Sequence, residues 1–219
     1  MSELQTLNAE QLKRMFQTIA EAIDRQKEYL GELDAVAGDG DLGVTLSAGF
    51  AGVAEGLAPC EETDIGKVLL LAAQALSRAA PSTFGTLLAT GILRAAKQAL
   101  GKCKVTASDW ASMIEAARRG IEERGKAQQG DKTVLDALIP AEEAWKSRAV
   151  SGGSFLECAK AALEAARKGV ERTCAMTPKA GRASWLKEKS IGHPDPGASA
   201  LVIVLEAILN YLKSIITED

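Results

Sequence analysis

The chain has 219 residues, of which 47% are hydrophobic and 25% are charged, a composition typical of a soluble globular protein with one sizeable core. Its formal net charge of -3 provides no basic field for nucleic acid, and its lysines and arginines are spread among acidic neighbours. We therefore expect a single domain over residues 1–219 and no nucleic-acid partner.

Helix-forming residues dominate the chain, because alanine, leucine, glutamate and lysine are abundant and the alternation typical of strands is nearly absent. The first helix is expected over residues 9–33, with Asn8 as its N-cap and one apolar stripe along its length. It ends at a turn rich in aspartate and glycine. Further helices are expected at residues 44–56 and 64–79, and a fourth from the break at 79–85 to residue 100.

The second half of the chain is also predicted to be helical. Ser108 is expected to cap the fifth helix, and Pro140 to kink the sixth. Residues 177–197 contain too much glycine, proline and charge for a plain connector. The remaining helices are expected at residues 109–125, 134–148, 155–176 and 198–216.

The connections between these helices predict the topology. Short connections between helices of similar length imply antiparallel neighbours, so we expect an all-α fold, an eight-helix antiparallel up-and-down bundle or closed barrel. In such a fold every second connection lies at the same end. The segments of unusual composition are those connections, and they occupy residues 34–43, 81–85, 125–133 and 177–197. A shared site at one end of the bundle is therefore predicted.

The amino-terminal residues and the cysteines indicate a cytoplasmic protein. Residues 1–10 have neither the basic start nor the apolar segment of a signal peptide. No uninterrupted apolar run approaches the roughly 20 residues of a membrane span, and the most apolar run, 201–205, is followed by Glu206. The four cysteines are far apart and form no Cys-x-x-Cys pair, so we expect them to be reduced. No membrane partner is expected.

Three aspartates crowd the first unusual connection: Asp34, Asp39 and Asp41. Carboxylates this close repel one another, and the flanking glycines bend the backbone so that the side chains converge, which a hard cation such as Mg²⁺ would relieve. The same pattern also suits a solvated turn without metal, because Asp and Gly are standard turn residues. A calcium-binding EF-hand is a poor alternative, since its twelfth position, counted from Asp39, is Phe50 instead of glutamate.

Four motifs follow one another along the chain. They are Leu33-Asp34 leading to Gly38-Asp39-Gly40-Asp41-x-Gly43, Gly130-Asp-Lys-Thr-x-Leu-Asp136, Gly181-Arg-Ala-Ser184, and Ser190-Ile-Gly-His-x-Asp195-Pro-Gly-Ala198. With these motifs the chain resembles, over essentially its whole length, the nucleotide-binding L subunit of dihydroxyacetone kinases. The resemblance implies an eight-helix closed barrel that holds ADP or ATP at one end through two Mg²⁺ ions. It also implies transfer of the γ-phosphoryl group to a short-chain ketose on a separate K subunit.

The resemblance gives roles to individual residues. Asp34, Asp39 and Asp41 match the metal-ligating aspartates, and with Arg182, which matches the arginine near the phosphates, they form the predicted catalytic set. The residues matched to the nucleotide are Leu42, Gly43, Val44 and Thr45 at the phosphates, Thr83, Phe84 and Gly85 at the head of the fourth helix, Gly125 and Val134 along the nucleotide, and Asp195, Pro196 and Gly197 against the nucleoside. Thr45 also suits a plain first-turn position, and Arg182 a generic basic loop.

Other residues in the unusual connections have alternative roles. His193 is the only histidine in the chain, so a metal site built from several imidazoles is excluded. A His-Pro turn is more often structural than acid-base, and we expect a structural or nucleotide-lining role for His193. Trp185, beside Ser184, is a candidate contact at the open end.

Two departures from the family pattern lie on the phosphate side. Leu42 stands where sugar-kinase members commonly have histidine, and Pro81-Ser-Thr-Phe-Gly85 replaces a Gly-Gly-x-Ser-Gly turn. These departures concern the phosphate acceptor and donor more than nucleotide binding, and a divergent subgroup acting on another small ketose or polyol would account for them.

The leading hypothesis from the sequence is a Mg²⁺-dependent phosphotransferase subunit. A non-catalytic ADP-binding adaptor is the alternative, motivated by the apolar Leu42 and Phe84, and a helical scaffold without ligand is the third. The sequence leaves open the phosphate acceptor and whether the nucleotide exchanges with ATP or is recharged by a phosphocarrier protein. Whether the chain forms a homodimer is open as well.

Overall fold

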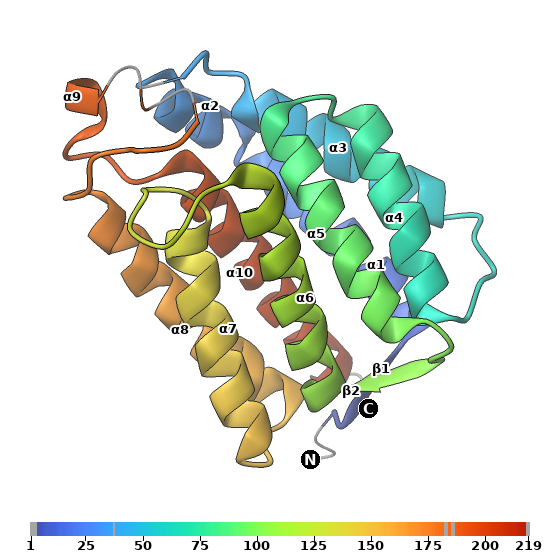
Figure 1. Cartoon of the computed structure of the whole chain (residues 1–219). Helices are drawn as coiled ribbons and strands as arrows, with labels where there is room; N and C mark the ends of the chain where they lie inside the picture. Colours follow the sequence, from blue (N-terminus) through green and yellow to red (C-terminus); the bar gives the residue numbers. More distant parts are fainter. Residues whose placement is uncertain (1–3, 37, 182–183, 185–186, 218–219) are drawn as a thin grey trace.

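The computed structural model describes residues 4–36, 38–181, 184 and 187–217, and these residues have the predicted all-α fold (Figure 1). The helices are α1 (Ala9–Arg25), α2 (Lys27–Ala35), α3 (Leu42–Leu57), α4 (Ile65–Ala79), α5 (Thr83–Ala99), α6 (Ala107–Gly125), α7 (Leu135–Val150), α8 (Phe155–Thr173), α9 (Lys187–Ser190) and α10 (Pro196–Thr217). Two short strands, β1 (Thr6–Asn8) and β2 (Lys104–Thr106), were not predicted.

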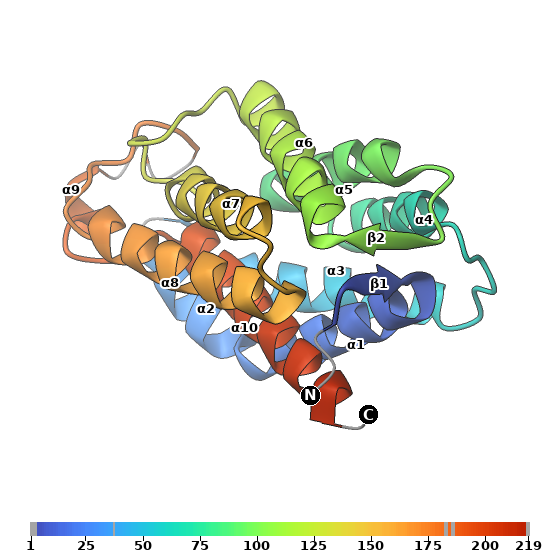
Figure 2. The ribbon, with the colours of Figure 1, turned by 90° about the horizontal axis from the view of Figure 1, so that it is seen from below.

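The long helices form a ring in chain order. After α1 and α2, each long helix packs against the next, from α3 through α8 to α10, and the last one, α10, packs against α1. Neighbouring helices run in opposite directions, as expected for up-and-down topology (Figure 1). Figure 2 views the molecule from below, where the antiparallel pair of β1 and β2 joins the residues before α1 to those before α6.

Side-chain caps explain where several helices begin. Asn8 caps α1 as predicted, and its side chain and that of Gln11 form a reciprocal capping box. The prediction that Ser108 caps the fifth helix was wrong, because α6 begins at Ala107. Thr106, extended at the end of β2, accepts from the backbone of Asp109, whose carboxylate accepts from Thr106 in return. This capping box starts the helix earlier than expected.

The predicted single helix over residues 9–33 is divided at Gln26, where ψ is 9°. The hydrogen bond from Leu30 N–H to Gln26 O (3.0 Å) continues across the break. At this point the start of α3 presses on α2, since a Cβ atom at Gly43 would lie 1.8 Å from the carbonyl oxygen of Lys27. The break therefore lies next to a close contact between the backbones of Gly43 and Lys27, which only glycine permits at position 43. This contact brings α2 and α3 together on either side of the aspartate turn.

The helix α8 ends earlier than the predicted residue 176. Its last residue, Thr173, is buried, and its hydroxyl donates to Val170 O (2.5 Å) and accepts from Asp195 N–H (2.9 Å). The chain then turns into the long connection before α10. The end of α8 is thus set by a contact with residues far along the chain.

Among the described helices, α10 is long and apolar enough to cross a membrane by length and composition alone, with a mean hydropathy of 1.8. In this fold it packs against α1, α7 and α8 as one wall of the ring. Its Glu206 forms an ion pair with Arg167 of α8 (2.6 Å). Of its most apolar window, 39% is buried inside the fold.

The four unusual connections lie at one end of the ring, as predicted (Figure 1). We call this end, made of the described residues within 34–43, 80–85, 126–134 and 174–197, the rim. Contacts confirm the proximity of its distant parts: Lys179 N–H donates to Asp131 O (3.0 Å), and a Cβ atom at Gly197 would lie 2.9 Å from the ring of Phe84 at the start of α5.

Candidate metal and nucleotide site

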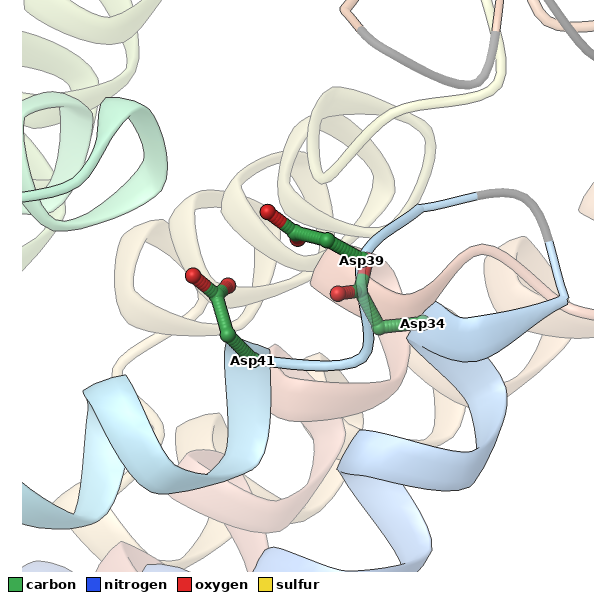
Figure 3. A group of neighbouring side chains, drawn as sticks. All are labelled: Asp34, Asp39 and Asp41. Carbon is green, nitrogen blue, oxygen red and sulfur yellow. The ribbon is translucent and has the colours of Figure 1, made fainter.

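Asp34, Asp39 and Asp41 converge at the rim. Asp34 lies in the last turn of α2, Asp39 in the following turn, and Asp41 directly before α3. Each offers one carboxylate oxygen, and these oxygen atoms all lie within 4.8 Å of one another (Figure 3). Asp34 is half-buried, whereas Asp39 and Asp41 are exposed. The group is therefore open to solvent.

The glycines of this turn hold the aspartates together. Gly40 N–H donates to Asp34 Oδ2 (2.9 Å), and Gly38 N–H donates to the backbone oxygen of Asp34 (2.6 Å). Gly40 has a φ of +77°, a conformation that glycine adopts readily. A Cβ atom at Gly38 would lie 2.4 Å from Asp34 Oδ1. Both glycines are thus needed for the carboxylates to face one another.

The first turn of α3 lies beside the aspartates, and the N-terminus of a helix carries a partial positive charge. Within the described part of the chain, no side chain caps this turn, and its first amides have no acceptor inside the helix. Thr45 N–H is already bonded to Asp41 O (2.9 Å), so the amides of Leu42, Gly43 and Val44 are those available to an anion. Leu42 could offer only its backbone to a ligand, because the residue is 8% exposed and its side chain belongs to the core. Thr45 is half-buried and Val44 is exposed.

The donor set fits a hard divalent cation. Three carboxylates supply oxygen ligands, which Mg²⁺ and Ca²⁺ prefer, and they supply none of the sulfur or imidazole ligands of a zinc site. The amide hydrogens of α3 act beside them, so the same place can hold cations and a phosphate group together. Phosphate oxygens and water would complete the coordination of Mg²⁺.

A second group of predicted residues forms an apolar part of the rim. Phe84 and Leu201 pack against a buried cluster that contains Val134, and the backbone of Gly197 lies against the Phe84 ring. Gly85 is buried, and a Cβ atom there would lie 2.2 Å from Ala80 O, so this position also requires glycine. The fold thus brings Phe84, Val134 and Gly197 together, although they are far apart in the sequence.

Asp195 is a buried carboxyl group that caps α10. Its Oδ2 accepts from Ala198 N–H (2.7 Å), and its backbone oxygen accepts from the Ser199 hydroxyl (2.9 Å). Pro196 follows at the first helical position, where proline is favoured. Burial raises the pKa of Asp195 to about 7, and the nearby Asp136 carboxylate acts in the same direction. Asp195 has a clear structural role, and its contact with the nucleoside stays a prediction.

The Asp195→Asn variant is expected to have a flatter pH dependence of stability between pH 3.8 and about 7. The folded protein keeps a proton on Asp195 that the unfolded chain releases above pH 3.8, so the stability from this proton is complete below that pH. It is lost as pH rises through about 7. Asparagine retains an acceptor for Ala198 N–H but carries no such proton. Urea unfolding across this pH range measures the effect, and parallel curves for the two proteins would contradict it.

Some predicted residues lie elsewhere or outside the described chain. Arg182 and Trp185 are among the residues that the structure does not describe. His193 is exposed in a turn where its N–H donates to Ser190 O (3.2 Å). Gly125, the last residue of α6, lies near Leu87 of α5. All four cysteines are free thiols.

Sequence reasoning used the Gly130 to Asp136 motif for its resemblance only, and the structure shows what the motif does locally. Asp136 Oδ1 accepts from Gly130 N–H (2.6 Å) and Asp136 Oδ2 accepts from Thr133 N–H (2.8 Å). Lys132, between them, is buried. Its burial has no simple sequence signal, because lysine is almost always exposed.

Comparisons with known proteins agree with this arrangement. The DAK2 domain family matches residues 36–210. The ADP-binding subunit DhaL of the PEP-dependent dihydroxyacetone kinase of Escherichia coli is 30% identical, over 93% of this chain and 97% of that protein. The ADP-binding subunit DhaL of the PEP-dependent dihydroxyacetone kinase 2 of Listeria innocua is 31% identical, over 97% of this chain and 99% of that protein.

Longer proteins also contain a similar region. The L-erythrulose kinase of Pectobacterium atrosepticum is 36% identical, over 84% of this chain but 32% of its own length. The crystal structure of the dihydroxyacetone kinase of C. freundii superimposes with a TM-score of 0.73 at 24% identity, covering 96% of this chain and 36% of that one. At this identity the likeness concerns the fold.

Proposed function

This chain belongs to the DAK2 domain family, and from that premise we propose that it is a Mg²⁺-dependent, nucleotide-binding subunit of a kinase. Its phosphoryl group would pass to dihydroxyacetone, or to a related small ketose or polyol, bound on a partner K subunit. The convergence of Asp34, Asp39 and Asp41 at an open rim carries the proposal. The names of the E. coli and Listeria relatives, both ADP-binding subunits, support it.

The proposed chemistry needs positioning and charge neutralisation more than covalent help from the protein. When bound, Mg²⁺ neutralises the charge on the phosphate oxygens. We propose that Asp34, Asp39 and Asp41 would hold two such ions. The amides of the first turn of α3 and the hydroxyl of Thr45 would orient the phosphates, and Arg182 is proposed as a further phosphate contact.

The nucleoside would lie on the apolar part of the rim. The half-buried Phe84, packed on the buried Val134, offers apolar surface, and Gly125, Thr83 and the Asp195-Pro196-Gly197 turn are proposed to border it. Because Asp39 and Asp41 are exposed, the phosphate end of a bound nucleotide would face outward, where a partner carrying the acceptor can reach it.

Isothermal titration of the protein with ADP, with and without Mg²⁺, tests the binding step. We expect ADP to bind only when Mg²⁺ is present, since without the cation three carboxylates repel the phosphates. Phosphoryl transfer to dihydroxyacetone in the presence of a K subunit tests the reaction. Tight binding of ADP without metal, or no binding at all, would contradict the proposal.

We further propose that the bound nucleotide is recharged in place by a phosphocarrier protein. The names of the E. coli and Listeria relatives, which combine PEP dependence with an ADP-binding subunit, support this source of phosphate. The test is gel filtration of protein loaded with ADP and Mg²⁺. Retention of stoichiometric ADP is expected, whereas rapid loss and replacement by ATP would indicate an ATP-dependent kinase.

The positions of two side chains in the structure weaken the alternative hypothesis of a non-catalytic ADP-binding adaptor. It relied on Leu42 and Phe84 as apolar bulk at the phosphates, but the Leu42 side chain is in the core, and Phe84 packs beside Val134 and Gly197. Phosphoryl transfer with the cognate partner would exclude it.

A further inference from the structure

Lys132 occupies an unusual place in the rim. Its side chain belongs to a residue only 4% exposed, and its backbone has a φ of +59°. Lysine is almost never fully buried, and a positive φ is uncommon for residues other than glycine. Burial lowers the pKa of Lys132, whereas the negative charge of Asp195 opposes that shift. Such a costly arrangement needs a compensating interaction.

The interaction is with two carbonyl groups of the long connection before α10. Lys132 Nζ donates to Ser190 O (2.5 Å) and to Met176 O (3.3 Å). These oxygens lie on either side of residues 177–189. The ammonium group therefore joins the outgoing and returning parts of this connection, although it comes from the loop between α6 and α7.

Two direct links join the same two parts nearer to the helices. Asp195 N–H donates to Thr173 Oγ1 (2.9 Å), and Gly192 N–H donates to Cys174 O (2.9 Å). The pairs 173 with 195, 174 with 192 and 176 with 190 form a ladder between antiparallel parts of the chain. The third link of the ladder is the one that Lys132 supplies.

The loop that carries Lys132 is itself held firmly. Asp136 accepts from the amides of Gly130 and Thr133 on either side of Lys132, and Asp131 Oδ2 accepts from Gln128 N–H (2.9 Å). The ammonium group thus projects from a fixed backbone, and its link fixes the connection relative to α6 and α7.

We propose that Lys132 is a positioning residue for the nucleotide, which it serves by closing the 173–195 ladder against the loop at residues 126–134. This inference rests on the proposed function. The bonds of Lys132 to Met176 O and Ser190 O fix the part of the ladder that leads to the Asp195-Pro196-Gly197 turn, which is proposed to border the nucleoside, so the position of that turn relative to residues 126–134 depends on the link that Lys132 makes.

The first test is hydrogen exchange of the full chain without nucleotide, comparing wild type with Lys132→Met. Loss of the ammonium group should accelerate exchange of the Lys179 and Gly192 amides, which are bonded at the two ends of the connection, by about tenfold or more, while exchange of the Gly40 amide is unchanged. This measurement needs no ligand, so it tests the link even if the protein binds no ADP. Unchanged exchange of both the Lys179 and the Gly192 amides would overturn the proposal.

The second test is the affinity for ADP in the presence of Mg²⁺. Lys132→Met is expected to weaken binding by about tenfold, since a charged hydrogen-bond donor is lost. If wild type binds no ADP, the proposed function fails and the exchange result stands alone. If wild type binds and the variant binds equally well, the nucleotide role of Lys132 is wrong.

Two further variants separate the hydrogen bonds from packing. Lys132→Gln is close to methionine in size but keeps N–H donors, so its exchange and affinity should lie between those of wild type and Lys132→Met. Equal defects in both variants would indicate packing alone and overturn the proposal. Lys179→Met is the matched control: it removes an exposed ion pair with Asp131 (3.5 Å) between the same two segments. Its affinity should stay within about twofold of wild type.

Discussion

The Asp41→Asn variant is expected to bind ADP with Mg²⁺ about 100-fold more weakly than wild type, a loss of about 2.7 kcal/mol. Asparagine removes one of three carboxylates whose oxygens lie within 4.8 Å of one another, and a neutral amide attracts Mg²⁺ much less than a carboxylate. Isothermal titration with ADP at fixed Mg²⁺ measures the change. Affinity within a few-fold of wild type would remove Asp41 from the site.

Asp41 is the most informative of the three aspartates because the fold does not depend on its carboxylate. Asp34 accepts from Gly40 N–H, so changing it disturbs the turn as well as the metal. Asparagine is also a favourable residue at the start of a helix. The free energy of unfolding without Mg²⁺ should therefore stay the same or rise slightly, as repulsion is relieved. Glu32→Gln, an exposed charge removal in α2, is the control and should leave ADP binding unchanged.

The Gly43→Ala variant should lower the free energy of unfolding by about 3 kcal/mol, at the upper end of the usual cost of overpacking. The added Cβ would lie 1.8 Å from Lys27 O and 2.7 Å from its carbonyl carbon, and neither atom can rotate away as a side chain can. The helices α2 and α3 must then separate, which moves Asp34 relative to Asp41. Mg²⁺-dependent ADP binding should fall together with stability.

Gly56→Ala in the same helix is the matched control for this substitution. A Cβ atom at Gly56 would make an ordinary contact of 3.5 Å with Ala75. Alanine is favoured over glycine inside a helix by about 1 kcal/mol, so this variant should be as stable as wild type or more stable. Urea unfolding of the two variants checks the contrast. Similar stabilities would show that the contact between Gly43 and Lys27 is not tight in solution.

Local signals explain what the sequence predicted well. Asn8 is followed three residues later by Gln11, so the first capping box could be read directly. The same pattern at Thr106 and Asp109 marks the true start of α6, which the prediction of Ser108 as the N-cap missed. The break at Gln26 has no such signal, because neither glycine nor proline stands there and the distorting contact comes from α3. The three-residue strands are too short to show an alternating pattern.

The two parts of the candidate site also differ in how far the sequence could predict them. The aspartates are close in sequence, and the glycines between them were enough to predict their convergence. The grouping of Phe84, Val134 and Gly197 follows from topology, which placed their connections at one end without showing which side chains meet. The contacts of Lys132 with Met176 and Ser190 could not be predicted, since they depend on the path of a long connection.

The contact between α10 and α1 has a consequence for biosynthesis. A ring that closes between its first and last helices cannot be completed while the ribosome is still adding residues 196–217. Until then the apolar face of α1 that α10 covers remains open to water and to other nascent chains. Contacts between such distant segments also form slowly. The nascent protein therefore passes through an aggregation-prone stage that ends only when α10 docks.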